Sequence, residues 1–256
     1  YARYLHCEAP TPDDACGRCP SCRAHDALQH PDLHWTFPVF KGEKADAALS
    51  QPFAAAWRNL LLERPQFGLE EWVEAIGADK KQLFISVHEA LEINRKLGLK
   101  AFKGGRKVLI CWLPETMRVD TANKMLKLIE EPTDGTVMLF VSEHYDQLLA
   151  TIRSRVQAVR VPRLDEALAA EAIERMTGLD AAASLELAGV VEGNLAAALR
   201  LVGAGGAAPD HELFVDWMRA CWGMKGAELV DQSERFAKPG REAMKRVGFL
   251  VGNHVP

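Results

Sequence analysis

The most regular hydrophobic pattern begins near residue 86 and alternates between the period of a helix and that of a strand. Ser86-Val-His-Glu89 has the form of a capping box, in which both side chains bind free amides at the start of a helix. Apolar residues then recur at helical spacing until Gly98, where we expect the helix to end. Val108–Leu113 follows as a continuous apolar run of strand length, the kind that is buried inside parallel sheets.

The same alternation repeats in the next segment. Asp120 is the predicted N-cap of a helix that ends before Pro132, because proline disfavours helix at the residue before it. One face of this helix is apolar and consists of Ala122, Met125, Leu126 and Ile129. The composition of Thr136–Ser142 predicts a second buried strand.

Two shorter elements complete the pattern. We expect a short helix through Leu148 and Leu149, followed by a strand through Val159 and Val161. Strands that alternate with helices indicate crossover connections. The sequence therefore predicts an α/β fold built on a parallel sheet.

Residues 36–82 lack a clear period. They contain Trp57 and Trp72, and two more tryptophans, Trp217 and Trp222, stand near the end of the chain. None of the four alternates with basic residues as a platform for stacking bases would, so we expect them to pack in a core.

The composition changes at Leu164, after which Ala and Leu dominate. Apolar residues recur at helical spacing, at Leu168, Ala172, Ile173 and Met176. We therefore predict an α/β domain over residues 1–163 and a small helical domain over residues 164–203. A further helical segment is expected over residues 204–256.

Composition and charge narrow the function classes. The chain has 31 Lys and Arg against 35 Asp and Glu, a net charge of −4, so it is not a polycation built to coat nucleic acid. No apolar run approaches the roughly 18–20 residues that cross a membrane, and no signal-peptide pattern is present, so we expect a cytoplasmic protein without a membrane partner. The chain starts at Tyr1 with no Met, and we expect it to be a piece of a longer protein.

Four of the six cysteines lie in the first 22 residues, at Cys7, Cys16, Cys19 and Cys22. Tetrahedral zinc takes four thiolates, and a Cys-x2-Cys turn places two of them on one metal without strain. Disulfides are the first rival interpretation, but they are rare in proteins that are not exported. A redox Cys-x-x-Cys is the second, and it needs only two of the four thiols.

The spacing therefore favours structural zinc. A catalytic zinc is disfavoured, because four thiolates leave no open position for water. Nearby histidines offer alternative ligands at His25, His30 and His34, but the four cysteines already complete the shell.

Several local patterns now stand in one order along the chain. After the four cysteines come His30-Pro31-Asp32-Leu33, then Ala122-Asn-Lys-Met-Leu-Lys-Leu-Ile-Glu-Glu-Pro132, then Leu149-Ala-Thr-Ile-Arg-Ser-Arg155. Together they resemble the clamp-loader family of bacterial DNA polymerase III, whose subunits are AAA+ proteins. Within that family the delta-prime subunit is the most similar, and the resemblance covers residues 1–205.

The resemblance implies an architecture and partners. Residues 1–163 would be an AAA+ domain with a P-loop-NTPase-like parallel sheet and an inserted zinc knuckle at 7–22. Residues 164–203 would be its helical lid, and residues 204–256 the start of a collar. The partners would be the gamma/tau and delta subunits and the sliding clamp, with primer–template DNA held by the assembled ring.

The sequence lacks the motifs that bind ATP in active members of the family, so we expect no ATP binding by this chain. No glycine is followed by lysine, so the G-x-x-x-x-G-K-[ST] phosphate loop is absent. By resemblance to the family, the magnesium-binding Asp and catalytic Glu would fall at Trp112 and Leu113, which bind no cation. We therefore expect an ATPase-silent subunit without enzyme activity of its own. The alternative is an active gamma/tau-like ATPase whose phosphate loop lies N-terminal to Tyr1.

The resemblance also assigns a catalytic role in trans to Ser154-Arg155. In the family a Ser-Arg-Cys motif presents an arginine finger to the ATP of a neighbouring subunit, and Val156 stands here in place of the Cys. An arginine that pairs with a surface carboxylate at the start of a strand is the other interpretation.

A basic cluster precedes the first predicted strand. It consists of Lys96, Lys100, Lys103, Arg106 and Lys107, which would either contact a DNA backbone or be solvated. We favour solvation, because charge runs are usually wet surface.

Overall fold

The computed structural model describes residues 1–42, 46–102 and 105–203. The predicted collar segment at 204–256, with Trp217 and Trp222, lies outside the described residues. The chain divides into two compact units, Tyr1–Arg160 and Val161–Pro256. We take them one at a time.

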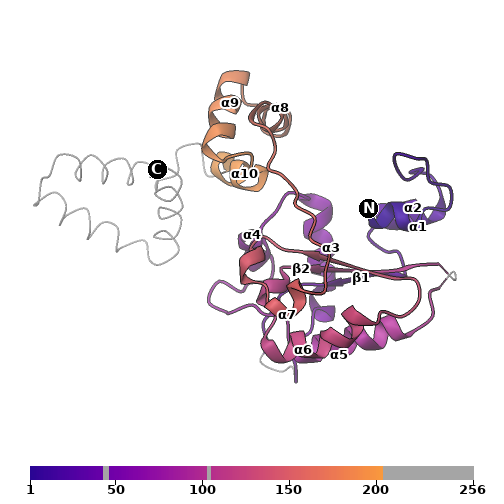
Figure 1. Ribbon diagram of the computed structural model, residues 1–256. Coiled ribbons are helices and arrows are strands. Elements are labelled where there is room, and N and C mark those ends of the chain that lie inside the picture. The colour runs from indigo at the N-terminus through magenta and orange to yellow at the C-terminus, as the bar shows by residue number, and fades with distance from the viewer. Residues whose placement is uncertain (43–45, 103–104, 204–256) are drawn as a thin grey trace, which may run out of the picture. The chain divides into compact units, whose positions relative to one another are not determined.

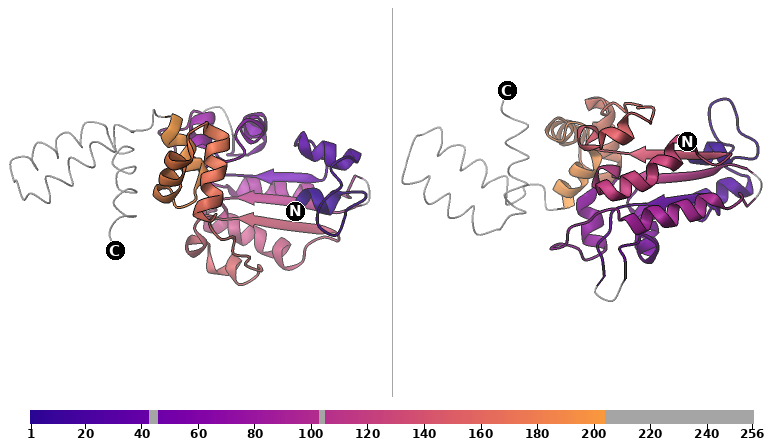
Figure 2. Two further views of the ribbon diagram at one scale, coloured as in Figure 1. Left: turned by 90° about the horizontal axis from the view of Figure 1, so that it is seen from above. Right: turned by 60° about the horizontal axis from the view of Figure 1, so that its bottom comes forward.

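The first unit is built on three parallel strands in the order β1-β2-β3. They are β1 (Leu33–Thr36), β2 (Lys107–Trp112) and β3 (Thr136–Val141). In the register of the sheet, Val108 lies opposite Leu33 on one side and Val137 on the other. The three arrows point the same way in the left view of Figure 2. The predicted α/β fold with a parallel sheet is confirmed.

The strands differ from the prediction in three respects. β1 lies at the edge of the unpatterned stretch and is too short to show a period. β3 is only half-buried, because in the described sheet it has no strand on its outer side. The predicted strand through Val159 and Val161 is wrong, since these side chains are 77% and 84% exposed and belong to no regular element.

Seven α-helices accompany the sheet within the described part of the first unit. They are α1 (Ala2–His6), α2 (Pro20–Asp26), α3 (Ala54–Glu63), α4 (Leu69–Ala75), α5 (Val87–Gly98), α6 (Val119–Glu130) and α7 (Ala150–Arg153). Helices α3 and α4 fall in the stretch without a clear period. The short helix predicted through Leu148 and Leu149 begins later, at Ala150.

Helices α5 and α6 cover one face of the sheet and lie side by side (Figure 1). From β2, Leu109 and Cys111 point into this layer and are buried. As the periodicity predicts, Ala90 and Leu97 from α5 and Ala122, Met125 and Ile129 from α6 enter this core. It also takes in Ile93 and Leu128, whereas the predicted Leu126 is only partly buried. This face holds the larger aliphatic core.

The opposite face carries an aromatic core beneath α3 and α4. Trp57 stacks on Phe37 with ring centroids 4.1 Å apart and meets Trp72 edge-on at 5.1 Å. Trp112 at the end of β2 also packs on Trp57, with centroids 5.1 Å apart. Trp57 and Trp72 are 3% and 0% exposed, so their predicted role in core packing is confirmed.

The predicted helix starts are only partly correct. Ser86 caps α5 by accepting a hydrogen bond from the Glu89 amide, as the capping box requires. The Glu89 carboxylate does not return to Ser86: it accepts from Thr36 Oγ1 (2.9 Å), Ser50 N (2.7 Å) and Ser50 Oγ (2.5 Å). For α6 the N-cap is Arg118 rather than Asp120, which lies within the first turn.

The described part of the second unit consists of α8 (Glu166–Thr177), α9 (Ala181–Val190) and α10 (Leu195–Gly203). Asp165 and Asp180 cap the first two by accepting from backbone amides. Ile173 is buried among the three helices, whereas Leu168 and Met176, predicted on the same face, are exposed. Gly193 has φ +78°, and a Cβ there would lie 2.6 Å from the Leu164 carbonyl oxygen, so glycine is required.

Among the described residues of both units, every helix is too short or too polar to cross a membrane.

Glu89 offers a test of the first unit's core. The carboxylate is 3% exposed and serves three donors from β1 and the loop at Ser50. Glu89→Ala should lower the free energy of unfolding by about 3 kcal/mol, because buried donors lose their acceptor. Glu92→Ala on the same helix removes only a solvent-facing pair with Arg95 and should leave the free energy of unfolding nearly unchanged. Urea unfolding of both variants measures the difference, and equal losses would contradict this role.

Candidate functional site

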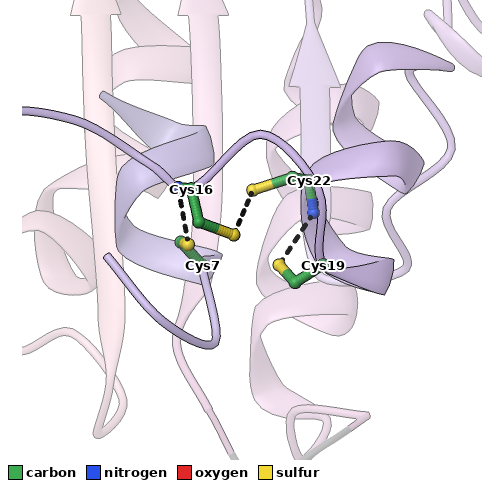
Figure 3. A group of neighbouring side chains, drawn as sticks. All are labelled: Cys7, Cys16, Cys19 and Cys22. Atoms are coloured by element: carbon green, nitrogen blue, oxygen red, sulfur yellow. Dashed lines mark hydrogen bonds between the residues drawn. The ribbon is translucent and has the colours of Figure 1, made fainter. Parts of the chain in front are cut away.

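Four cysteines gather where α1 and α2 meet. Cys7 follows the last residue of α1, and Cys16 lies in the connecting loop. Cys19 is the N-cap of α2, whose first turn contains Cys22. The four sulfur atoms lie within 4.8 Å of one another (Figure 3). Gly17, with φ +69°, provides the left-handed turn that brings the loop back.

The sulfur spacing suits one tetrahedral ion. Two thiolates at about 2.3 Å from zinc lie about 3.8 Å apart, and the Cys16 and Cys22 sulfurs are 4.0 Å apart. That separation is twice the length of a disulfide bond, and all four cysteines are free thiols. Backbone amides point at two of the sulfurs: Cys16 N donates to Cys7 Sγ (3.2 Å) and Cys22 N to Cys19 Sγ (3.4 Å).

The pKa shifts of Cys16 and Cys22 also fit a cation. Backbone hydrogen bonds from Arg18 and Cys19 lower the pKa of Cys16 to about 6, so this sulfur is readily a thiolate. Burial raises the pKa of Cys22 to about 12, so a thiolate there needs a positive charge beside it. A divalent metal supplies that charge. The four cysteines can therefore hold a metal ion in a closed shell, with no position left for a reacting water.

Three histidines form a second group next to the cysteines. The sequence pointed to His25, His30 and His34, but the structure groups His25 and His30 with His6, while His34 lies in β1. His6 was missed, although its place beside Cys7 was a usable signal. Burial lowers the pKa of His6, and it lowers that of His25 to about 4, so both rings are neutral near pH 7.

These histidines are poorly arranged to ligate one ion. The rings of His6 and His30 are stacked, with centroids 4.0 Å apart and planes inclined by 9°. A metal lies close to the plane of each imidazole that binds it, and one ion cannot lie in two parallel planes that are stacked. The alternative ligand set is therefore not supported by this geometry.

Arg155 lies in the turn after α7, and about one third of its side chain is exposed. Its Nε donates to Glu130 Oε1 at the end of α6. Its Nη1 donates to the Thr151 carbonyl oxygen (2.9 Å) and to Ser154 Oγ (3.1 Å). Within the described residues, Nη2 has no hydrogen-bond partner. The arginine thus pairs with a carboxylate, but from a turn rather than from the start of a strand.

At the end of β2, buried apolar side chains occupy the two positions at which the resemblance expects carboxylates. Trp112 and Leu113 are both buried in the aromatic core. Glu115 follows closely, but its Oε1 accepts from the amides of Glu143 and His144, each at 3.1 Å. This carboxylate therefore holds the loop after β3.

The basic cluster is only partly solvated. Lys107 is 5% exposed, and its Nζ donates to the carbonyl oxygens of Leu97 and Leu99 and to Thr133 Oγ1. It satisfies the end of α5, so its assignment to wet surface is wrong. Arg106 is exposed, and Lys103 lies outside the described residues.

Residues 1–165 match the family described as "DNA polymerase III, delta subunit". The chain belongs to this family. The resemblance to clamp-loader subunits of bacterial DNA polymerase III is thereby confirmed, and relatives of the family agree with delta-prime. A protein named DNA polymerase III subunit delta' from Pseudomonas aeruginosa is 29% identical over 206 residues, 80% of this chain and 51% of the relative. One of the same name from Escherichia coli K12 is 26% identical over 156 residues, 60% of this chain and 34% of the relative.

The chain spans about half the length of the first of these relatives and a third of the second. Two solved structures are less similar to this chain in sequence. A DNA polymerase III gamma subunit-related protein from Thermotoga maritima has a TM-score of 0.35 and 21% identity over 66% of this chain and 72% of its own. RuvB from the same organism has a TM-score of 0.38 and 13% identity, over 73% and 68%. At these scores neither likeness carries an argument.

Proposed function

We propose that this chain is a delta-prime-like subunit of a sliding-clamp loader in DNA replication. The match of residues 1–165 to the family is the observation that carries the proposal. In the assembled ring the chain would contact gamma/tau and delta subunits in the cytoplasm, and the ring would place the clamp on primer–template DNA. The helices α8 to α10 would form its lid.

The subunit is proposed to be ATPase-silent. Support comes from the end of β2, where an active member would need carboxylates to bind magnesium and activate water. Trp112 instead fills the aromatic core against Trp57, and Glu115 is engaged by two backbone amides. The alternative is an active gamma/tau-like ATPase with a phosphate loop N-terminal to Tyr1.

ATP hydrolysis by the full-length protein separates these two candidates. We expect no ATP turnover by the isolated subunit, because the positions expected for the magnesium-binding Asp and the catalytic Glu hold Trp112 and Leu113. A radiolabelled ATP hydrolysis assay at saturating magnesium measures it. Turnover by the isolated subunit would favour the gamma/tau-like alternative.

Arg155 is proposed to act in trans, as an arginine finger on the ATP of a neighbouring subunit, with Ser154 beside it. Its partly exposed guanidinium, whose Nη2 remains open in the described structure, supports this role. The bond to Glu130 is no obstacle, because a pair this exposed is worth only about 0.2–1 kcal/mol. A finger that stabilises charge on a transferred phosphoryl group is worth about 10³–10⁵ in rate.

Two substitutions distinguish a finger from a surface ion pair. Arg155→Ala should slow hydrolysis at the neighbouring site of the reconstituted ring by about 10³-fold or more, since the transition state loses its cation. Glu130→Gln removes only the surface partner and should change that rate by no more than about fivefold. Single-turnover ATP hydrolysis measures both, with assembly of each ring checked by gel filtration. Equal effects of the two substitutions would show that the arginine serves only the ion pair.

The four cysteines are proposed to hold one structural Zn²⁺. Their sulfur spacing and amide hydrogen bonds support this assignment. When bound, zinc would cross-link α1, the loop and α2. Cys7, Cys16, Cys19 and Cys22 would be its ligands.

Metal analysis tests the zinc site directly. The full-length protein should contain about one zinc per chain, and Cys19→Ser should lose it because a hydroxyl is a much weaker zinc ligand than a thiolate. Cys111→Ala, in the core beneath α5 and α6, should keep the metal. Elemental analysis after dialysis gives the count. A folded wild-type protein without metal would refute the assignment.

A further inference from the structure

The two halves of the cysteine site are carried by different helices, and a pair of histidines joins them. α1 ends at His6 and delivers Cys7 as the next residue, while α2 carries Cys19 at its N-cap and Cys22 in its first turn. His25 lies three residues after Cys22 and therefore on the same face of α2. The His6 Nδ1 and His25 Nε2 atoms are 2.7 Å apart.

The direction of this hydrogen bond follows from the other nitrogen of His6. His6 Nε2 lies 2.8 Å from the carbonyl oxygen of Arg106, and a carbonyl oxygen only accepts, so His6 Nε2 carries the proton. The Nδ1 atom of the neutral ring is then an acceptor, and His25 Nε2 donates to it. Two directed hydrogen bonds thus run from α2 through α1 to Arg106, one residue before β2.

His30 closes the group from a third side. Its ring stacks on His6 and lies 4.8 Å, centroid to centroid, from that of His25. Its Nδ1 accepts a hydrogen bond from Asp32 N (3.2 Å), in the segment that enters β1. The three rings therefore connect both helices of the cysteine site to the beginnings of β1 and β2.

The helices need this support because they contribute almost no core of their own. Within residues 1–30 the only buried apolar side chains are Ala2 and Cys22. Helices of five and seven residues are not stable in isolation. Besides the solvent-exposed salt bridge between Arg3 and Asp26 (3.1 Å), a bound metal ion and the histidine group are what can fix α1 against α2.

We propose that His6 and His25 are positioning residues of the metal site, with their hydrogen bond setting the spacing between Cys7 on one side and Cys19 and Cys22 on the other. The bond from His6 to Arg106 fixes this pair to the sheet. The inference rests on the proposed zinc site and assigns the histidines as supports rather than ligands. Groups that orient metal ligands without touching the metal typically change its affinity by about 10–100-fold.

A matched pair of substitutions at His25 tests the hydrogen bond itself. His25→Leu puts an apolar side chain of similar size in place of the ring and so removes the donor. His25→Gln places an amide N–H where it can still donate to His6. Zinc affinity of the full-length protein is measured by competition with a chromophoric chelator. We expect about 10–100-fold weaker binding for the Leu variant and a largely restored affinity for the Gln variant. His88→Gln, at an exposed position of α5, serves as the control and should match wild type.

Cobalt substitution separates support from ligation. In every His25 variant the Co²⁺ spectrum should keep the thiolate charge-transfer bands of a four-sulfur site, at a higher cobalt concentration for the Leu variant. Far-UV circular dichroism confirms that each variant is folded. Equal zinc affinity in the Leu, Gln and wild-type proteins would overturn the inference while leaving the zinc site intact. Two metal ions per wild-type chain, one of them lost in both His25 variants, would also overturn it by making the histidines ligands. A wild-type protein that binds no zinc would refute the site and the inference together.

Discussion

Strand β2 must be buried on both faces, and the organisation of the first unit follows from that constraint. Its alternate side chains enter two different cores, Leu109 and Cys111 beneath α5 and α6, and Trp112 among the aromatic rings. A central parallel strand has no solvent face, so it reads as a continuous apolar run. Helices therefore cover both faces of the sheet. The segments directly before and after β2 are held in place because the strand between them is buried.

At the carboxyl end of β2, the aromatic core occupies positions where an ATP-hydrolysing protein would need carboxylates. Ligands of open α/β sheets bind at the carboxyl ends of the strands, and a carboxylate there must stay hydrated or bound to metal. Trp112 is 8% exposed and packs on Trp57 and Phe67, so the aromatic core extends to the end of the strand. Glu115 Oε1 accepts from two amides of the loop after β3, and its Oε2 has no hydrogen-bond partner among the described residues. The same packing that buries Trp112 would also account for the proposed lack of ATP hydrolysis.

Periodicity located the elements that bury a long apolar stripe, α5, α6 and β2, because hydrophobic burial is what the pattern records. It missed β1, whose four residues are too few to show a period. It also gave no sign of α3 and α4, which bury few apolar side chains: Trp57 and Leu60 in α3 and Trp72 in α4. The hydrophobic pattern also does not indicate which side chains form long-range hydrogen bonds. The partners of Glu89 are 39 and 53 residues away in sequence, and Lys107 looks like any surface lysine until the end of α5 is placed beside it. The four cysteines stood out because their spacing is local. The histidine group was only partly predicted: His25 and His30 were named as alternative ligands, but His6 and its hydrogen bond to His25 were not.

The amino end of β2 anchors the segment that carries the four cysteines. α1 and α2 lie at the amino ends of the strands (Figures 1 and 2), and His6 is bonded to Arg106 just before β2 begins. A strand rises about 3.3 Å per residue, so six residues separate this anchor from the carboxyl end by about 20 Å. A metal held at the amino end cannot reach reactants at the opposite edge of the sheet. A closed shell of four sulfurs and the distance from that edge would both suit a structural role, in which a bound metal would order a segment that has too few apolar residues to order itself.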